Sequence, residues 1–333
     1  MDYQALIVGQ DYAFLRTSPH LGRRICYLTL SGSRAYGTNH AASDVDIRGF
    51  ALERPEEIFG TQHFEQAEDK ATDTVIYSLQ KFVHLCSQCN PNVIEMLGTE
   101  PEHVLCCNAV GRLIRDHADL FLSKRSYYTF TGYATAQLRR LQNALARDSY
   151  PQAAKMEHIR RSLEQIMLTC QEQYHIHEGD ITFASEDSGD EEQEKELYTS
   201  VHIDHITLRR FLAINTDIGT MLRNYGKLNK RNHKKDLPHL RKHAMHLIRL
   251  FLTGLDILEG RGIHTYRREE HDLLLGIRAG DVSFDEVFRL TDEYEQKIRH
   301  AFEISKLPDR PDEAAINNLL VSCYKTGTEA GLF

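Results

Sequence analysis

The N-terminal part of the chain alternates between apolar and polar positions in strand-like patterns. Residues 25–30 form a continuous apolar run, which predicts one buried strand. From about residue 44 to residue 52, apolar positions alternate with polar ones, and this predicts a second strand with one polar face. A β-branched run at residues 72–77 predicts a third strand, whereas the polar residues 53–71 predict a loop.

Helical spacing of apolar residues dominates the rest of the chain. Residues 78–89 predict a helix that begins with Ser78 as its cap and ends before Asn90-Pro91. Further helices are expected at residues 93–97, 127–145, 158–174, 207–222, 240–258 and 291–305. Strands followed by helices predict an α+β fold. We expect a small mixed sheet in a first domain, residues 1–110, and a helical domain, residues 111–333.

Charge is unevenly distributed along a chain whose formal net charge is −8. The acidic segment 186–196 lacks apolar periodicity and predicts an exposed loop near residues 180–200. The basic stretch 225–235 is the strongest positive patch, and it indicates either contact with a triphosphate or an RNA backbone, or a solvated face. The net negative charge argues against a non-specific nucleic-acid coat.

Composition also indicates where the protein works. No apolar run reaches the length of a membrane span, and the N-terminus lacks the basic region and cleavage site of a signal peptide. The seven cysteines are an odd number outside the context of a small secreted domain, so we expect reduced thiols. We therefore expect a cytoplasmic protein without a membrane segment, of an oligomeric state that the sequence does not indicate.

The candidate chemistry lies between the first two predicted strands. Gly32-Ser33 follows the first strand, where glycine lets the backbone approach a ligand and the serine hydroxyl can donate to phosphate oxygens. Asp44 and Asp46 then follow at positions i and i+2, which share one face of a strand. Two like charges held that close require a cation between them.

These residues carry a family resemblance. Gly32-Ser33, followed some ten residues later by Asp44-Val45-Asp46, resembles the G-S…D-x-D pattern of the DNA polymerase β-type nucleotidyltransferase superfamily. The wider segments LTLSGSRAYGTNHAASDVDIRGFAL, TVIYSLQKFVHLCSQCNPNVIEML and KHAMHLIRLFLTGLDIL are similar to its stand-alone bacterial and phage members. The resemblance covers most of the chain outside residues 176–200. It implies transfer of a nucleoside monophosphate from a nucleoside triphosphate (NTP) to an acceptor hydroxyl, with release of pyrophosphate.

The resemblance also implies a set of site residues. Mg²⁺, or Mn²⁺, would be held by Asp44, Asp46 and a third carboxylate, and carboxylates with substrate phosphates are the ligands that Mg²⁺ prefers. We assign the third carboxylate to Asp73, with Asp69 as the alternative outside the β-branched run. Gly32, Ser33 and Arg34 would contact the phosphates of the NTP, for which ATP is the expected nucleotide.

The helix at residues 240–258 offers a second group of polar side chains. Lys242, His243, His246 and Arg249 lie on adjoining faces of it. The resemblance places this helix beside the active-site cleft, where Lys242 or Arg249 would pair with the β and γ phosphates. The alternative is that they are only the polar side of an amphipathic helix, with His246 as a hydrogen-bonded core histidine. Glu95 is expected to be a capping or salt-bridge residue.

A cluster of cysteines and histidines permits a different site. Cys86-Ser87-Gln88-Cys89, with His84, His103, Cys106 and Cys107, has the composition of a zinc site. Cys86 also continues the apolar stripe of its helix, and free cysteine is among the most buried residue types. Core thiols are therefore the favoured interpretation.

We expect, in sum, a metal-dependent nucleotidyltransferase. Its acceptor would be an RNA such as tRNA, a protein or a small molecule, and the family likeness also suggests toxin–antitoxin or phage-defence enzymes. The alternative is a non-catalytic module that binds a nucleotide or RNA on the same fold.

Overall fold

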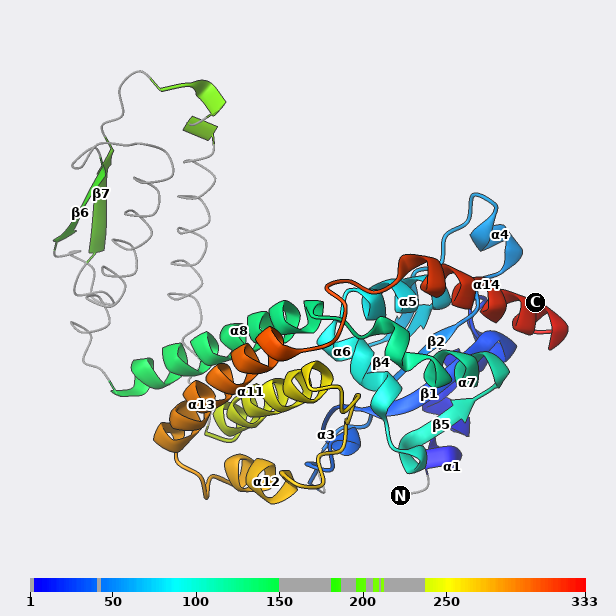
Figure 1. The fold of residues 1–333 in the computed structure, drawn as a ribbon, viewed down its shortest axis with the longest axis horizontal. Coiled ribbons are helices and arrows are strands. Elements are labelled where there is room, and N and C mark those ends of the chain that lie inside the picture. Colours follow the sequence, from blue (N-terminus) through cyan, green and yellow to red (C-terminus); the bar gives the residue numbers. More distant parts are fainter. Residues whose placement is uncertain are drawn as a thin grey trace. The chain divides into compact units, whose positions relative to one another are not determined.

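A computed structural model describes residues 3–40, 43–149, 181–186, 196–201, 206–209, 211–212 and 237–333 (Figure 1). The chain divides into two compact units, one formed by Met1–Arg139 with Leu237–Phe333 and the other by Arg140–Asp236. None of the helices in the described part has the length and hydropathy needed to cross a membrane. The expected domain boundary at residue 110 stays a prediction.

The second unit contains an antiparallel hairpin of β6 (Ile181–Glu186) and β7 (Glu196–Val201). Both strands lie in the region near residues 180–200, where the sequence predicted a loop, and they include Glu186 and Glu196 at the two ends of the acidic segment. Residues 187–195 lie outside the described residues. The predicted helix 158–174, most of the predicted helix 207–222 and the basic stretch 225–235 also lie outside them.

The first unit is built on a mixed five-stranded sheet, which confirms the expected α+β fold class. Its strand order is β3-β4-β2-β1-β5, with β2 and β4 parallel and every other neighbouring pair antiparallel. The strands are β1 (Ile25–Ser31), β2 (Asp46–Ala51), β3 (Gln66–Asp69), β4 (Thr74–Ser78) and β5 (Val104–Cys107). The apolar run of β1 is buried almost throughout, as a strand in the interior of a sheet requires.

The sheet differs from the sequence-based expectation at two strands. β3 lies inside the segment predicted as a loop, because its sequence Gln-Ala-Glu-Asp carries no apolar alternation and pairing with β4 defines it. β2 begins at Asp46, two residues later than predicted, so Asp44 lies in the preceding loop. There the Arg34 guanidinium donates to the backbone carbonyls of Ser43 (2.7 Å) and Asp44 (3.0 Å), which holds this loop away from strand pairing.

Helices surround the sheet and form the C-terminal part of the unit. Ser78 caps α5 as predicted, since its hydroxyl accepts a hydrogen bond from the Lys81 amide at 3.2 Å. The described helices are α1 (Tyr3–Val8), α2 (Phe14–Thr17), α3 (Gly32–Ala35), α4 (Pro55–Ile58), α5 (Leu79–Ser87), α6 (Pro91–Ile94), α7 (Ala109–Asp116), α8 (Arg125–Ser149), α11 (Leu237–Leu258), α12 (His271–Ala279), α13 (Phe284–Ile304) and α14 (Glu313–Glu329).

The helix α11 is the centre of the C-terminal helices, packed against α12 and α13 (Figure 1). Its predicted apolar stripe is buried, and from Ala244 onward nearly every residue is buried, which is typical of a helix enclosed on all sides. Gly254 permits a close approach, because a Cβ atom there would lie 3.0 Å from both Phe130 of α8 and Ile298 of α13.

The C-terminal helix α14 returns to the sheet and packs along α7 and α5 (Figure 1). Its Tyr324 hydroxyl donates to the buried Glu53 carboxylate at 2.7 Å. Glu53 follows the end of β2 opposite to Asp46 and also accepts a hydrogen bond from the Gln80 amide. α14 therefore fastens the end of β2 that is remote from the aspartates.

Gly49, in the centre of β2, allows a test of the sheet packing. A Cβ atom there would lie 2.2 Å from the Tyr27 carbonyl oxygen and 2.7 Å from Leu28 Cδ2. Gly49→Ala should therefore destabilise the fold by about 1–3 kcal/mol through overpacking, which thermal and urea unfolding would measure. Gly132→Ala is the matched control: it lies in α8 with no atom within 4 Å, and should stabilise by about 0.5–1 kcal/mol. Equal stability of Gly49→Ala and wild type would contradict the described packing.

Candidate functional site

Two carboxylates meet at one end of the sheet. Because β2 and β4 are parallel, with Ile47 paired with Thr74, the residues that precede this first pair lie side by side. These residues are Asp46 and Asp73, and their carboxyl groups share a hydrogen bond. The backbone is joined at the same level, since the Ile47 amide donates to the Asp73 carbonyl at 3.3 Å. Asp73 has a φ of 44°, a conformation uncommon for residues other than glycine.

The electrostatics of the pair are those of two acids sharing one proton. Burial, the hydrogen bond to Asp73 and the Asp73 charge raise the pKa of Asp46 to about 6, against the opposing effect of Arg48 and Lys242. For Asp73, partial burial opposes ionisation, but the hydrogen bonds from Asp46 and Arg48 prevail and lower its pKa. Asp46 therefore carries the shared proton more readily than Asp73.

Two cations act on this carboxylate pair from different elements. Arg48, two residues along β2, forms an ion pair with Asp73 Oδ1 at 2.8 Å and also donates to the Asp73 carbonyl. Lys242, exposed near the start of α11, lowers the pKa of both aspartates through its charge. The structure thus brings Lys242 to the same end of the sheet as Asp46 and Asp73.

The Gly32-Ser33 turn lies directly against Asp46. Ser31 is the register partner of Asp46, and Gly32 follows with a φ of 59°. A Cβ atom on Gly32 would lie 1.8 Å from Asp46 Oδ2, so no larger residue fits beside the carboxylate in this arrangement. Arg34, by contrast, is buried, and its guanidinium contacts the 43–44 loop and the Tyr3 hydroxyl (3.1 Å).

Two further aspartates named in the sequence analysis are Asp44, predicted as a ligand together with Asp46, and Asp69, the alternative to Asp73; neither contributes to the pKa shifts of the Asp46–Asp73 pair. Asp44 is exposed in the loop before β2. Asp69 ends β3, where its carboxylate accepts from the Thr72 hydroxyl at 2.8 Å and from the Ala71 amide at 3.3 Å, as a turn cap. Across the described parts of the chain, no three His, Cys, Asp or Glu side chains are arranged to hold a metal ion.

Arg249, the other predicted phosphate ligand, is buried in a polar cluster. Its side chain is 1% exposed and forms an ion pair with the Glu95 carboxylate, which is 4% exposed. The guanidinium carbon lies 3.7 Å from the centre of the Tyr36 ring, and Nη2 donates to His246 Nδ1 at 2.9 Å. Glu95 is thus a salt-bridge residue, as expected, and His246 is hydrogen-bonded and half-buried.

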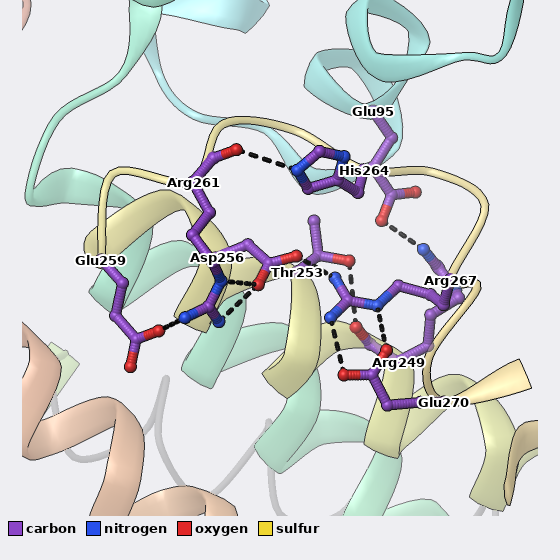
Figure 2. A network of polar contacts seen from close by, with 9 residues as sticks. All are labelled: Glu95, Arg249, Thr253, Asp256, Glu259, Arg261, His264, Arg267 and Glu270. Atoms are coloured by element: carbon purple, nitrogen blue, oxygen red, sulfur yellow. Dashed lines mark hydrogen bonds and ion pairs between the residues drawn. The ribbon is translucent and has the colours of Figure 1, made fainter.

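This cluster continues along α11 into the segment that follows it (Figure 2). Arg267 is buried and pairs with Asp256 and with Glu270. Arg261 contacts the other oxygen of Asp256 at 2.7 Å. The chain from α11 to α12 is therefore fixed by charge pairs to the helix before it.

Sequence reasoning missed two residues of this region. Arg48 lies on the polar face of β2 with Asp46, but its partner Asp73 depends on parallel pairing that the sequence pattern does not reveal. Tyr36 belongs to the polar turn, and its contacts with Glu95 and Arg249 join segments far apart in the sequence. For Tyr36, the one signal in the sequence is its position three residues after Ser33.

The cysteine cluster contributes buried thiols. Cys86 and Cys89 are fully buried, as the interpretation as core residues predicts. Burial raises the pKa of both thiols, so they are protonated at neutral pH. Cys89 donates to the Phe121 carbonyl at 3.4 Å.

A comparison with known families supports the resemblance found in the sequence. Residues 10–172 match the family described as RlaP, the RNA repair pathway DNA polymerase beta family. This match, which spans both aspartates and the Gly32-Ser33 turn, confirms the likeness to DNA polymerase β-type nucleotidyltransferases. No curated protein and no solved structure matches the chain significantly.

The coupled aspartates lead to a titration experiment. In metal-free protein, the carboxyl ¹³C signal of Asp46 should titrate with a midpoint of about 6. Asp73→Ala removes a like charge and a hydrogen bond that both raise this pKa, so the midpoint should fall. Asp69→Ala is the control and should leave it unchanged. An Asp46 midpoint that is the same with and without Asp73 would contradict the described pair.

Proposed function

We propose that the protein is a metal-dependent nucleotidyltransferase that transfers a nucleoside monophosphate from an NTP, ATP for preference, to an acceptor hydroxyl. The observation that carries the proposal is the meeting of Asp46 and Asp73 beside the Gly32-Ser33 turn, with Lys242 on the facing helix. The family match over residues 10–172 supports the same reaction class.

The carboxylate pair fits a hard divalent cation. Two carboxyl groups close enough to share a hydrogen bond, with the pKa of one raised to about 6, form a site where added positive charge is favourable. Asp46 and Asp73 would hold Mg²⁺ or Mn²⁺, and Asp44, exposed on the adjacent loop, is the proposed additional ligand. When bound, the cation supplies charge that neutralises the carboxylates and the NTP phosphates.

The chain's own residues would bind and orient the triphosphate. The Gly32 backbone and the Ser33 hydroxyl would contact phosphate oxygens next to Asp46, and Lys242 would contribute a positive charge. Arg34 and Arg249 are the other predicted ligands; because both are buried and hydrogen-bonded elsewhere, we assign the phosphate contact to Lys242 first. In the reaction, the acceptor oxygen bonds to the α phosphorus, the bond to the leaving pyrophosphate breaks, and the hydroxyl proton passes to solvent.

An RNA hydroxyl is the favoured acceptor in this proposal. The matched family is described by an RNA repair pathway, and the basic stretch 225–235 has the composition that binds an RNA backbone. A protein or a small molecule is the alternative acceptor, and we place the enzyme in the cytoplasm. A role as toxin or phage-defence enzyme is compatible with the same chemistry.

Substitution of the aspartates tests the proposal. Asp44→Ala, Asp46→Ala and Asp73→Ala should each reduce Mg²⁺-dependent pyrophosphate release by at least about 100-fold, because each removes a proposed ligand. Pyrophosphate would be measured with ATP and total cellular RNA, and again after addition of EDTA, which should stop release.

Asp69→Asn is the matched control, since Asp69 caps the neighbouring turn, and it should retain activity. Full activity of both the Asp46 and Asp73 variants would refute the site. A non-catalytic nucleotide-binding module would show ATP binding in isothermal titration but no turnover in any variant or in wild type.

A further inference from the structure

The Gly32-Ser33 turn is held by backbone hydrogen bonds from the residues that follow it. Tyr36 is the C-cap residue of α3, and its amide donates to the Gly32 carbonyl at 3.1 Å. The Thr38 amide donates to the Ser33 carbonyl at 2.9 Å. The backbone of residues 36–38 is therefore hydrogen-bonded to both residues of the turn.

Tyr36 itself is fixed by the buried ion pair of Glu95 and Arg249. Its hydroxyl donates to Glu95 Oε2 at 3.1 Å, while Arg249 lies over its ring. Burial raises the pKa of Tyr36, so the hydroxyl remains a donor at neutral pH. Glu95 is held in turn by Thr265, whose hydroxyl donates to the Glu95 carbonyl at 2.5 Å.

Gly37, the residue after Tyr36, contacts both the segment between α11 and α12 and the first residue of α12. Gly37 has a φ of 71°, and a Cβ atom there would lie 2.1 Å from the Tyr266 ring. His271 Nε2 donates to the Gly37 carbonyl at 2.9 Å, and its ring stacks on Tyr266. Tyr36 and Gly37, which follow the Gly32-Ser33 turn, thus both contact the C-terminal part of the unit.

The same helix carries Lys242. Lys242 and Arg249 are seven residues apart, which places them on one side of α11, separated by about 10 Å along its axis. Since α11 is buried and continuous between them, fixing Arg249 against Tyr36 also fixes Lys242 relative to the turn. A line of contacts therefore runs from Arg249 through Tyr36 and Gly32 to the Asp46 carboxylate.

We propose that Tyr36, Glu95 and Arg249 form a positioning clamp that holds the Gly32-Ser33 turn and Lys242 in register with Asp46 and Asp73. These residues act through the turn and through α11, without touching the nucleotide. The clamp's role in catalysis rests on the nucleotidyltransferase function proposed above. Its effect on the turn does not.

Tyr36→Phe is the most specific test, because it removes one hydroxyl and keeps the ring that Arg249 covers. Tyr324→Phe is the matched control: that hydroxyl also donates to a buried glutamate, Glu53, at the opposite end of β2. Both variants should lose a similar amount of thermal stability. Glu95→Gln and Arg249→Lys complete the series if they fold.

Two measurements separate positioning from a merely structural role. Hydrogen–deuterium exchange of residues 31–38 should be faster in Tyr36→Phe than in wild type, and unchanged in Tyr324→Phe. With ATP, Mg²⁺ and total cellular RNA, kcat/KM for ATP should fall about 10- to 100-fold in Tyr36→Phe only, because small misplacements of bound groups are costly. KM for the RNA should not change.

The kinetic and exchange results test the clamp and the proposed function separately. If wild type transfers the nucleotide and Tyr36→Phe keeps the wild-type kcat/KM for ATP, the clamp has no positioning role. This holds whatever rate of hydrogen–deuterium exchange residues 31–38 show in that variant. If wild type transfers nothing, the proposed transfer from ATP to RNA is refuted, and the hydrogen–deuterium exchange alone decides: faster exchange confined to Tyr36→Phe supports the clamp, and equal exchange in both variants overturns it.

Discussion

The ion pair between Glu95 and Arg249 joins segments 154 residues apart and fixes how the C-terminal helices meet the sheet. Both side chains are almost fully buried, so each charge depends on the other and on added contacts from Tyr36 and His246. Removing one partner of such a pair typically costs about 3–5 kcal/mol, because the remaining charge is left buried without compensation. The arrangement of the site therefore depends on a contact that faces away from it.

Parallel pairing of β2 with β4 is the second constraint, and it brings the two carboxyl groups together. The two strands begin at the same edge, so Asp46 and Asp73 come together although 27 residues separate them. Their shared hydrogen bond and the raised pKa of Asp46 follow from that proximity. The Gly32-Ser33 turn completes the site because glycine alone fits against the Asp46 carboxylate. The carboxylate pair, the glycine turn and the buried ion pair thus come from different elements.

Local sequence patterns predicted much of the secondary structure but few of the contacts between residues that are distant in the sequence. β1, β4 and the stripe of α11 were predictable because burial imposes a period on the sequence. The strand β3 was not, since its polar sequence is ordered only by its neighbour. Asp46 and Asp73 were named from residue type and resemblance, and the structure brings them together, whereas their role as ligands stays a prediction. Arg249 was named as a phosphate ligand, and the sequence did not indicate its buried ion pair with Glu95. Such long-range contacts leave no period in the sequence.

The most direct measurement follows the fate of each phosphate of the nucleotide. The protein would be incubated with Mg²⁺ and total cellular RNA or total protein, using ATP labelled either at the α or at the γ phosphorus. Nucleotidyl transfer predicts that the α label becomes attached to the acceptor while the γ label appears in pyrophosphate. Attachment of the γ label, or no attachment of either label with any of the four ribonucleotides, would contradict the account.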